Sequence, residues 1–157
     1  MSKRQAFFRG MRRGIPVVLG FIPVGIAYAV MARQAGFTIG QTCGLSLSVF
    51  AGASQMMAVG MYSQGATVFA MIVATFLINF RHLIMSTCVY DRMTPTSLPL
   101  RLLSAFGVTD ESFALFTTSG PADRSVWYYL GMNLVMYSSW NVGTLIGAVA
   151  SDLLPPS

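Results

Sequence analysis

The sequence predicts an all-α integral membrane protein with about five transmembrane helices, organised as a single membrane domain over residues 1–157. Of the 157 residues, 54% are hydrophobic and only 10% are charged, whereas soluble domains carry about 25% charged residues. Charges are also absent from long stretches, because no Asp, Glu, Lys or Arg occurs in residues 34–80 or 125–151. Apolar stretches of this length are typical of membrane spans.

A basic tail, residues 1–13, precedes the first apolar segment and holds five of the ten Lys and Arg residues. The positive-inside rule therefore predicts a multi-pass protein with its N-terminus in the cytoplasm. The net charge of +5 then reflects membrane orientation, and we expect no nucleic-acid partner. A secretory signal peptide is the alternative, but the apolar stretch after Arg13 continues to Ala32, which is longer than the apolar region of about 7 to 15 residues in such peptides.

Turn-forming residues divide the rest of the chain into five apolar segments. Gln34–Gly36, Ser63–Gly65, the proline-containing stretch 91–99 and residues 120–123 separate them. The predicted membrane segments are residues 14–32, 39–62, 66–90, 100–119 and 126–150. Five crossings would place the 91–101 loop outside and the 120–125 loop inside. A re-entrant pairing of the second and third segments would exchange the sides of the later loops, and the sequence shows no convincing internal repeat.

The first irregularity within an apolar segment is Gly20-Phe21-Ile22-Pro23-Val24-Gly25. A proline inside a helix removes one hydrogen bond and clashes with the preceding turn, so we expect a broken helix near Pro23. Open backbone at membrane depth is tolerated only beside protein or a water-filled cavity, which makes Pro23 and Gly25 candidate substrate-site residues. A simple packing kink fits the same residues.

The second irregularity is Asn79-Phe80-Arg81-His82, which lies inside the third apolar segment. A charge at the bilayer centre costs about 3 kcal/mol on insertion scales and therefore needs a partner. Histidine titrates near physiological pH, so His82 is a candidate proton relay. Alternatively, the pair lies at the membrane interface, where Arg81 extends to water.

The third irregularity, Gly107-Val108-Thr109-Asp110-Glu111-Ser112, places two acids in the fourth segment. Thr109 or Asp110 can cap a helix, and acids suit its first turn, so a second helix break is expected near Asp110. Neighbouring helical residues point about 100° apart. We therefore expect one acid to pair with Arg81 and the other to face the transport pathway, although a purely structural ion pair is also consistent.

A polar but uncharged site is predicted in the second segment, where Ala51-Gly52-Ala53 is followed by Ser54 and Gln55. Small residues favour close packing of membrane helices, whereas Ser54 and Gln55 can also contact a substrate. The two cysteines, Cys43 and Cys88, lie in apolar segments without metal-site or disulfide spacing. No cofactor is expected.

Four motifs together resemble the AzlC family of bacterial branched-chain amino-acid permeases. They occur in the family's order within residues 7–147, and they read Gly-Phe-Ile-Pro-Val-Gly (20–25), Phe-Ala-Gly-Ala-Ser-Gln (50–55), Asn-Phe-Arg-His-Leu-Ile-Met (79–85) and Thr-Asp-Glu-Ser-Phe-Ala (109–114). The resemblance implies a secondary transporter that exports valine, leucine, isoleucine and sometimes methionine across the bacterial inner membrane. It also implies a small membrane partner of the AzlD type. Family members usually continue with further membrane helices, so this chain is expected to be a short or truncated member.

Two other functions fit parts of the pattern. A noncatalytic membrane subunit of a larger permease fits the short length, and a homo-oligomer is also possible. An intramembrane serine hydrolase would use Ser54 as the nucleophile and His82 as the base. The glycine that follows the serine in rhomboid proteases is missing here, however, and Arg81 does not fit that pattern. We therefore expect a transporter and not an enzyme.

Overall fold

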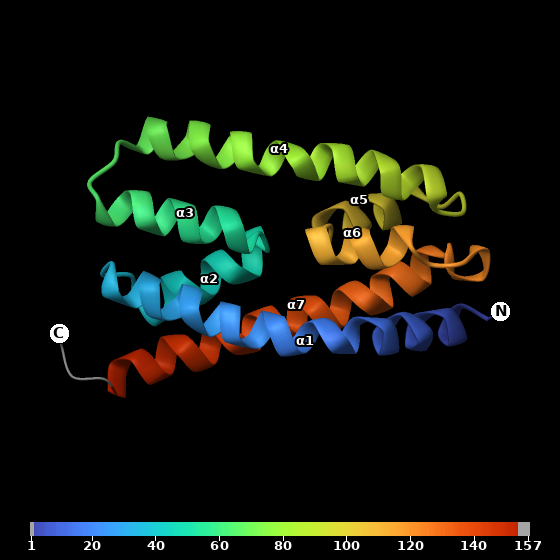
Figure 1. Ribbon diagram of the computed structural model, residues 1–157, viewed down its shortest axis with the longest axis horizontal. Coiled ribbons are helices and arrows are strands. Elements are labelled where there is room, and N and C mark those ends of the chain that lie inside the picture. Colours follow the sequence, from blue (N-terminus) through green and yellow to red (C-terminus); the bar gives the residue numbers. More distant parts are fainter. Residues whose placement is uncertain (1, 154–157) are drawn as a thin grey trace. The chain divides into compact units, whose positions relative to one another are not determined.

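The computed structural model describes residues 2–153, and within this range it contains α-helices and short 3₁₀-helices but no strand (Figure 1). The predicted all-α class is therefore confirmed. The elements are α1 (Lys3–Gln34), α2 (Ile39–Val49), α3 (Gly52–Ser63), α4 (Val68–Arg92), α5 (Leu98–Phe106), α6 (Asp110–Thr117), η1 (Pro121–Asp123), α7 (Val126–Ala150) and η2 (Ser151–Leu153).

Helix length separates two groups of elements. Helices α1, α4 and α7 have 32, 25 and 25 residues, and 25 residues extend over roughly 37 Å, enough for a hydrocarbon core of about 30 Å. Helices α1 and α4 are also apolar enough to cross a membrane. The other four α-helices have 8 to 12 residues, at most about 18 Å. Residues 39–62 and 100–119, each expected as one segment, thus each form two short helices.

The two predicted helix breaks have opposite outcomes. The break expected near Pro23 is wrong, because α1 continues without interruption from Lys3 to Gln34. A single proline removes one backbone hydrogen bond, and membrane helices tolerate that loss when neighbouring groups or small local adjustments compensate. The break expected near Asp110 is confirmed, since α5 ends at Phe106 and α6 begins at Asp110.

The chain divides into two compact units, which are described separately. Unit 1 consists of Met1–Leu19 and Arg81–Ser138, and unit 2 consists of Gly20–Phe80 and Ser139–Ser157. Unit 1 thus holds the α5–α6 pair, with the N-terminal parts of α1 and α7 and the C-terminal part of α4. Unit 2 holds the α2–α3 pair and the remaining parts of the same three long helices.

In unit 2, α2 and α3 form an antiparallel helical hairpin (Figure 1). Helix α2 begins with a capping box between Thr38 and Gln41, and the chain reverses at Phe50, whose φ of 44° is left-handed. The ring of Phe37, before α2, lies 5.0 Å from that of Tyr62, near the end of α3. The two outer ends of the hairpin are therefore together.

Unit 1 contains a second hairpin, formed by α5 and α6. Its reversal uses residues 107–109, and Thr109 caps α6 through a capping box with Ser112. Before α5, the backbone N–H of Thr94 donates to the carbonyl of Arg124 at 2.9 Å. The guanidinium of Arg92 donates to the carbonyl of Thr117, the last residue of α6, at 2.5 Å. The outer ends of this hairpin are therefore together as well.

Helices α1 and α7 pack closely in each unit because glycines remove side-chain bulk from their interface. In unit 1, a Cβ atom on Gly10 would lie 1.9 Å from the carbonyl oxygen of Tyr128, and one on Gly131 would lie 2.1 Å from that of Phe7. In unit 2, a Cβ atom on Gly143 would lie 2.5 Å from the carbonyl oxygen of Ile22. Small residues that let backbones approach are typical of packed membrane helices.

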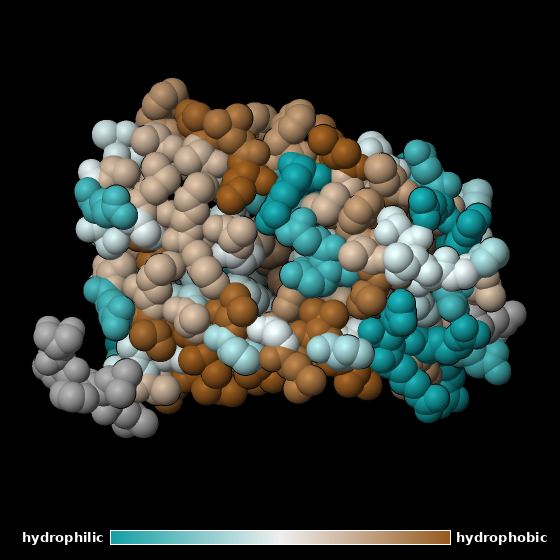
Figure 2. Space-filling model, in the orientation of Figure 1, coloured by the Kyte–Doolittle hydropathy of each residue, from teal (hydrophilic) through white to brown (hydrophobic). Residues whose placement is uncertain are grey.

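Exposed side chains follow the pattern expected of a membrane protein. Figure 2 shows hydrophilic side chains gathered where Figure 1 places the N-terminal residues of α1, and the basic residues of the tail are exposed. Along α4, nine large hydrophobic side chains are exposed, from Val68 to Ile84. An apolar surface this extensive marks contact with lipid or protein rather than water.

The glycine contacts predict different consequences for two substitutions in one helix. Gly10→Ala should destabilise the protein by about 1–3 kcal/mol, the usual cost of overpacking, because the clash is with backbone. Gly20→Ala is the matched control, since no atom lies within 4 Å of its added Cβ. Thermal unfolding of the detergent-solubilised protein measures both. Equal midpoints for the two variants would contradict the close packing of α1 on α7.

Candidate functional site

An ion pair between α4 and α6 is the main charged feature of unit 1. The guanidinium Nη1 of Arg81 lies 2.7 Å from the carboxylate Oδ2 of Asp110. The expected pairing of Arg81 with one of the two acids is therefore formed, and the acid is Asp110. The side chains are 40% and 52% exposed, so both remain accessible from outside the unit's core. The Nε of Arg81 is buried and donates no hydrogen bond in the described part of the chain.

Glu111 and His82 flank this ion pair in sequence. Glu111 is exposed, and it forms no ion pair with any residue that the structure describes. Because adjacent helical residues point about 100° apart, Glu111 offers its carboxylate to a different direction from Asp110. His82 follows Arg81 on α4 and is half-buried. Unit 1 therefore presents one cation and two carboxylates at a helix break, with a titratable histidine next in sequence.

Helix α6 is held in place by contacts that the sequence analysis did not anticipate. The hydroxyls of Ser112 and Tyr129 lie 3.1 Å apart, joining α6 to α7. The ring of Phe116 lies 4.9 Å from that of Tyr129 in an edge-on arrangement. The spacing Thr109-x-x-Ser112 was the available signal for the cap, whereas nothing local in the sequence indicates Tyr129 as the partner.

Unit 2 contains a buried network of hydroxyl and amide groups around the α2–α3 hairpin. The amide Nε2 of Gln55 donates to Oγ of Ser46 at 3.3 Å, and the hydroxyl of Ser46 lies 2.8 Å from that of Thr144 on α7. The hydroxyl of Tyr28 on α1 donates to the carbonyl of Thr42 at 3.2 Å. Gln55 was predicted as a site residue, but the residues that contact it were not. They are single polar residues surrounded by apolar sequence, so nothing local marks them.

An aromatic group borders this network. The ring of Trp140 on α7 stacks on that of Tyr28 with centroids 5.9 Å apart. The indole N–H of Trp140 and Oε1 of Gln55 are both buried, and within the described residues neither makes a hydrogen bond. An unpaired buried polar group costs about 1–3 kcal/mol, so these two atoms are candidate contacts for a polar ligand. Gly25 lies beside the same tryptophan, since its Cβ would lie 2.9 Å from the Trp140 carbonyl oxygen.

Ser54 is buried at the start of α3 and bonds to the backbone of its own chain segment. It is 1% exposed, and its hydroxyl donates to the carbonyl of Ala51 at 2.9 Å. A serine nucleophile instead needs a neighbouring general base and access to substrate. The hydrogen bond to Ala51 gives Ser54 a role in holding the first turn of α3.

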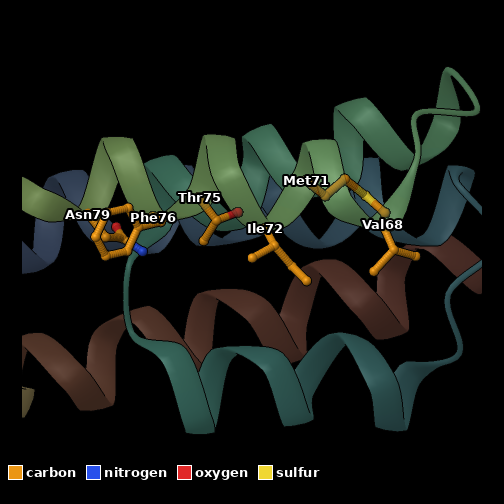
Figure 3. Close-up of a pocket in the computed structure, with 6 residues that line it drawn as sticks. All are labelled: Val68, Met71, Ile72, Thr75, Phe76 and Asn79. Carbon is orange, nitrogen blue, oxygen red and sulfur yellow. The ribbon is translucent and has the colours of Figure 1, made fainter.

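Asn79 lies at one end of a groove of about 450 Å³ along α4. Figure 3 shows the lining side chains in a row along this helix, where Asn79 and Thr75 are the polar members among apolar neighbours. The Oδ1 of Asn79 is buried and has no hydrogen-bond partner among the described residues.

The predicted site residues thus separate into two groups. Unit 1 holds Arg81, His82, Asp110 and Glu111, of which Arg81 and Asp110 are in contact. Unit 2 holds Pro23, Gly25, Ser54, Gln55 and Asn79. Of these, Pro23 is exposed on the uninterrupted helix α1, so the broken-helix role predicted for it is not supported. The described residues contain no group of His, Cys, Asp and Glu side chains that could hold a metal ion.

These features define an α-helical membrane protein with short paired helices and ionisable side chains inside apolar sequence. Within this class, the sequence model of the AzlC protein family matches residues 16–154, so the chain belongs to the AzlC family. The resemblance found in the four motifs is confirmed.

The chain is also similar to individual membrane and transport proteins over most of its length. The chain is 36% identical over 154 residues to an uncharacterized membrane protein of Archaeoglobus fulgidus, covering 98% of this chain and 67% of the relative. It is 29% identical to the inner membrane protein YgaZ of Escherichia coli, covering 93% and 61%. It is 27% identical to the branched-chain amino acid transport protein AzlC of Bacillus subtilis, covering 95% and 61%. The chain thus spans about three-fifths to two-thirds of their length, and no solved structure matches it.

The buried network predicts a difference between two serines of α2. Ser46→Ala should destabilise the protein by about 1–3 kcal/mol, because it removes the acceptor for Gln55 and the partner of Thr144. Ser48→Ala is the control, since Ser48 is exposed and its hydroxyl donates only to backbone carbonyls of its own helix. Thermal unfolding in detergent compares them. A Ser48→Ala variant as unstable as Ser46→Ala would contradict the role of the network.

Proposed function

We propose that this protein is a secondary transporter of branched-chain amino acids, namely valine, leucine, isoleucine and also methionine. The substrate class is supported by family membership and by the name of the Bacillus subtilis relative. The mechanism is supported by one observation above all, the Arg81–Asp110 ion pair at the start of α6 with Glu111 beside it. Ionisable residues inside membrane segments mark substrate or ion pathways.

The chemistry of an amino acid matches this group of charges. A zwitterionic substrate carries one carboxylate and one ammonium, and unit 1 supplies a guanidinium and two carboxylates. The substrate carboxylate would bind the guanidinium of Arg81, while its ammonium would bind Asp110 or Glu111. In this mechanism the substrate replaces each partner of the ion pair with an equivalent charge, so neither charge is left unpaired during binding.

Direction, energy source and partner complete the proposal. We propose export from the cytoplasm across the bacterial inner membrane, together with a small AzlD-type membrane subunit. The sequence contains no Gly-x-x-x-x-Gly-Lys-Ser/Thr phosphate-binding loop, which agrees with coupling to the membrane gradient instead of ATP. His82, the histidine that follows Arg81, is the candidate proton carrier.

An efflux assay tests this function. Cells loaded with leucine- and methionine-containing dipeptides should release the amino acids faster when they express the protein with an AzlD-type subunit. Asp110→Asn and Arg81→Ala should reduce efflux to the level of empty cells, because each leaves one charge of the pair uncompensated. Membrane abundance is measured for every variant, so that lost activity is separated from lost protein.

Ser54→Ala is the matched control in the same assay. It should retain efflux, because Ser54 contacts the backbone at the start of its own helix, whereas a serine hydrolase would lose activity. Efflux by the wild type that equals that of empty cells, even with the AzlD-type subunit present, would overturn the proposed function. An accessory role in a larger permease would then account better for this chain.

A further inference from the structure

We propose that the chain is an inverted-topology repeat. In this arrangement the α2–α3 hairpin enters the membrane from the external face, and the α5–α6 hairpin enters it from the cytoplasmic face. Helices α1, α4 and α7 are then the three crossings, in place of the five that the sequence predicts. This inference is independent of which solute is transported.

The first support is a constant spacing along the chain between equivalent helix boundaries. The three long helices end at Gln34, Arg92 and Ala150, and the step from the first to the second equals the step from the second to the third. The same step separates the first residues of α4 and α7, Val68 and Val126. It also separates the first residues of α3 and α6, Gly52 and Asp110. Each repeat therefore contains a long helix followed by a pair of short helices.

Buried serines occupy equivalent positions in the two hairpins. In the repeat register, which places Gln34 on Arg92, Ser46 and Ser54 correspond to Ser104 and Ser112, and all four serines are at most 1% exposed. Ser54 and Ser112 are each the third residue of a helix. Each of these two hydroxyls donates to the carbonyl of the residue before its helix, at 2.9 and 3.2 Å. Equal spacing, equal burial and an equal hydrogen bond indicate one structural unit used twice.

Contacts inside each unit show that the chain leaves each hairpin close to the point at which it enters. The Phe37 and Tyr62 rings are in contact in unit 2, and Thr94 bonds to Arg124 in unit 1. A chain that crossed the membrane between the members of either pair would hold them a bilayer apart, about 30 Å. The short helices also have too few residues to cross. Neither hairpin therefore crosses the membrane.

The connectivity of the chain then implies that the two hairpins enter the membrane from opposite faces. One long helix, α4, separates the two hairpins in sequence, joined to α3 by residues 64–67 and to α5 by residues 93–97. If α4 crosses once, its two ends face opposite sides of the membrane, and so do the hairpins attached to them. Inverted repeats with discontinuous helices are the architecture of many secondary transporters.

The distribution of charge favours this topology over five crossings. With three crossings, eight of the ten Lys and Arg residues are cytoplasmic and only Arg33 is external, while Arg81 lies within α4. The cytoplasmic residues are Lys3, Arg4, Arg9, Arg12, Arg13, Arg92, Arg101 and Arg124. With five crossings, Arg92 and Arg101 would be external. The positive-inside rule therefore prefers three crossings.

The repeat also identifies how the two hairpins differ. In the repeat register, Gly52 and Ala53 at the start of α3 correspond to Asp110 and Glu111 at the start of α6. Only the hairpin that opens toward the cytoplasm carries acids at its reversal. The two hairpins thus have equivalent backbone structures, but only one of them carries acidic side chains at its reversal. This difference would distinguish the two faces of the membrane.

Cysteine labelling in intact cells tests the topology. Native Cys43 and Cys88 are replaced by alanine, and single cysteines are introduced by Ser2→Cys, Gln34→Cys, Gln64→Cys and Ser97→Cys, all at exposed positions. A membrane-impermeant maleimide is applied to intact and to permeabilised cells. Ser2→Cys and Gln34→Cys mark the two faces under either topology, because only α1 separates them.

The proposal predicts that Gln64→Cys labels from the same side as Gln34→Cys, and that Ser97→Cys labels from the same side as Ser2→Cys. Five crossings predict the reverse for both positions, and that result would overturn the proposal. Labelling of residues 64 and 97 from one common side would also overturn it, because α4 would then not separate the hairpins. Only variants with wild-type abundance in the membrane fraction are compared.

Discussion

An arginine within a long apolar helix needs a partner when that helix crosses a membrane, and in this protein Asp110 pairs with Arg81 of α4. The constraint fixes more than the two side chains. Arg81 lies on α4, so its partner must come from a neighbouring element, and Asp110 is available because α6 begins there. The helix break at Asp110 and the pairing of Arg81 therefore depend on each other. A continuous helix through residues 100–119 would not place the acids in its first turn.

In the proposed topology the chain reverses inside the membrane, which imposes a second constraint because every buried backbone group there needs a partner. The two hairpins satisfy it differently. Thr109 and Ser112 cap α6 reciprocally, whereas in the other hairpin α2 ends at a left-handed Phe50 and no side chain caps the start of α3. Each hairpin is then joined to α7 by hydroxyls, through Thr144 in one unit and Tyr129 in the other. The polar side chains that look dispensable in apolar sequence are the ones that hold the reversals.

The sequence predicted the class, the break at Asp110 and the acid–arginine pairing, because each produces a local signal in an otherwise apolar chain. It failed at Pro23, where α1 tolerates the loss of one hydrogen bond. It also missed the reversal at Phe50, because neither flanking residue is a typical turn former. The hydrogen-bond network around Gln55 could not be predicted, since it joins Ser46 to Thr144, which are 98 positions apart and meet only through packing. The internal repeat could not be recognised in the sequence, because the two halves share the spacing of their helix boundaries more than the identity of their residues.

The most direct test of the central claim is a charge swap at the ion pair, measured for both abundance and amino-acid efflux. Arg81→Asp and Asp110→Arg should each lower membrane abundance, because each single change places like charges together. The double variant restores opposite charges, so we expect abundance to recover while efflux stays at the level of empty cells, since the substrate's charges would meet the wrong partners. Recovery of efflux together with abundance would contradict the account, because the pair would then be a structural bond and not a binding site.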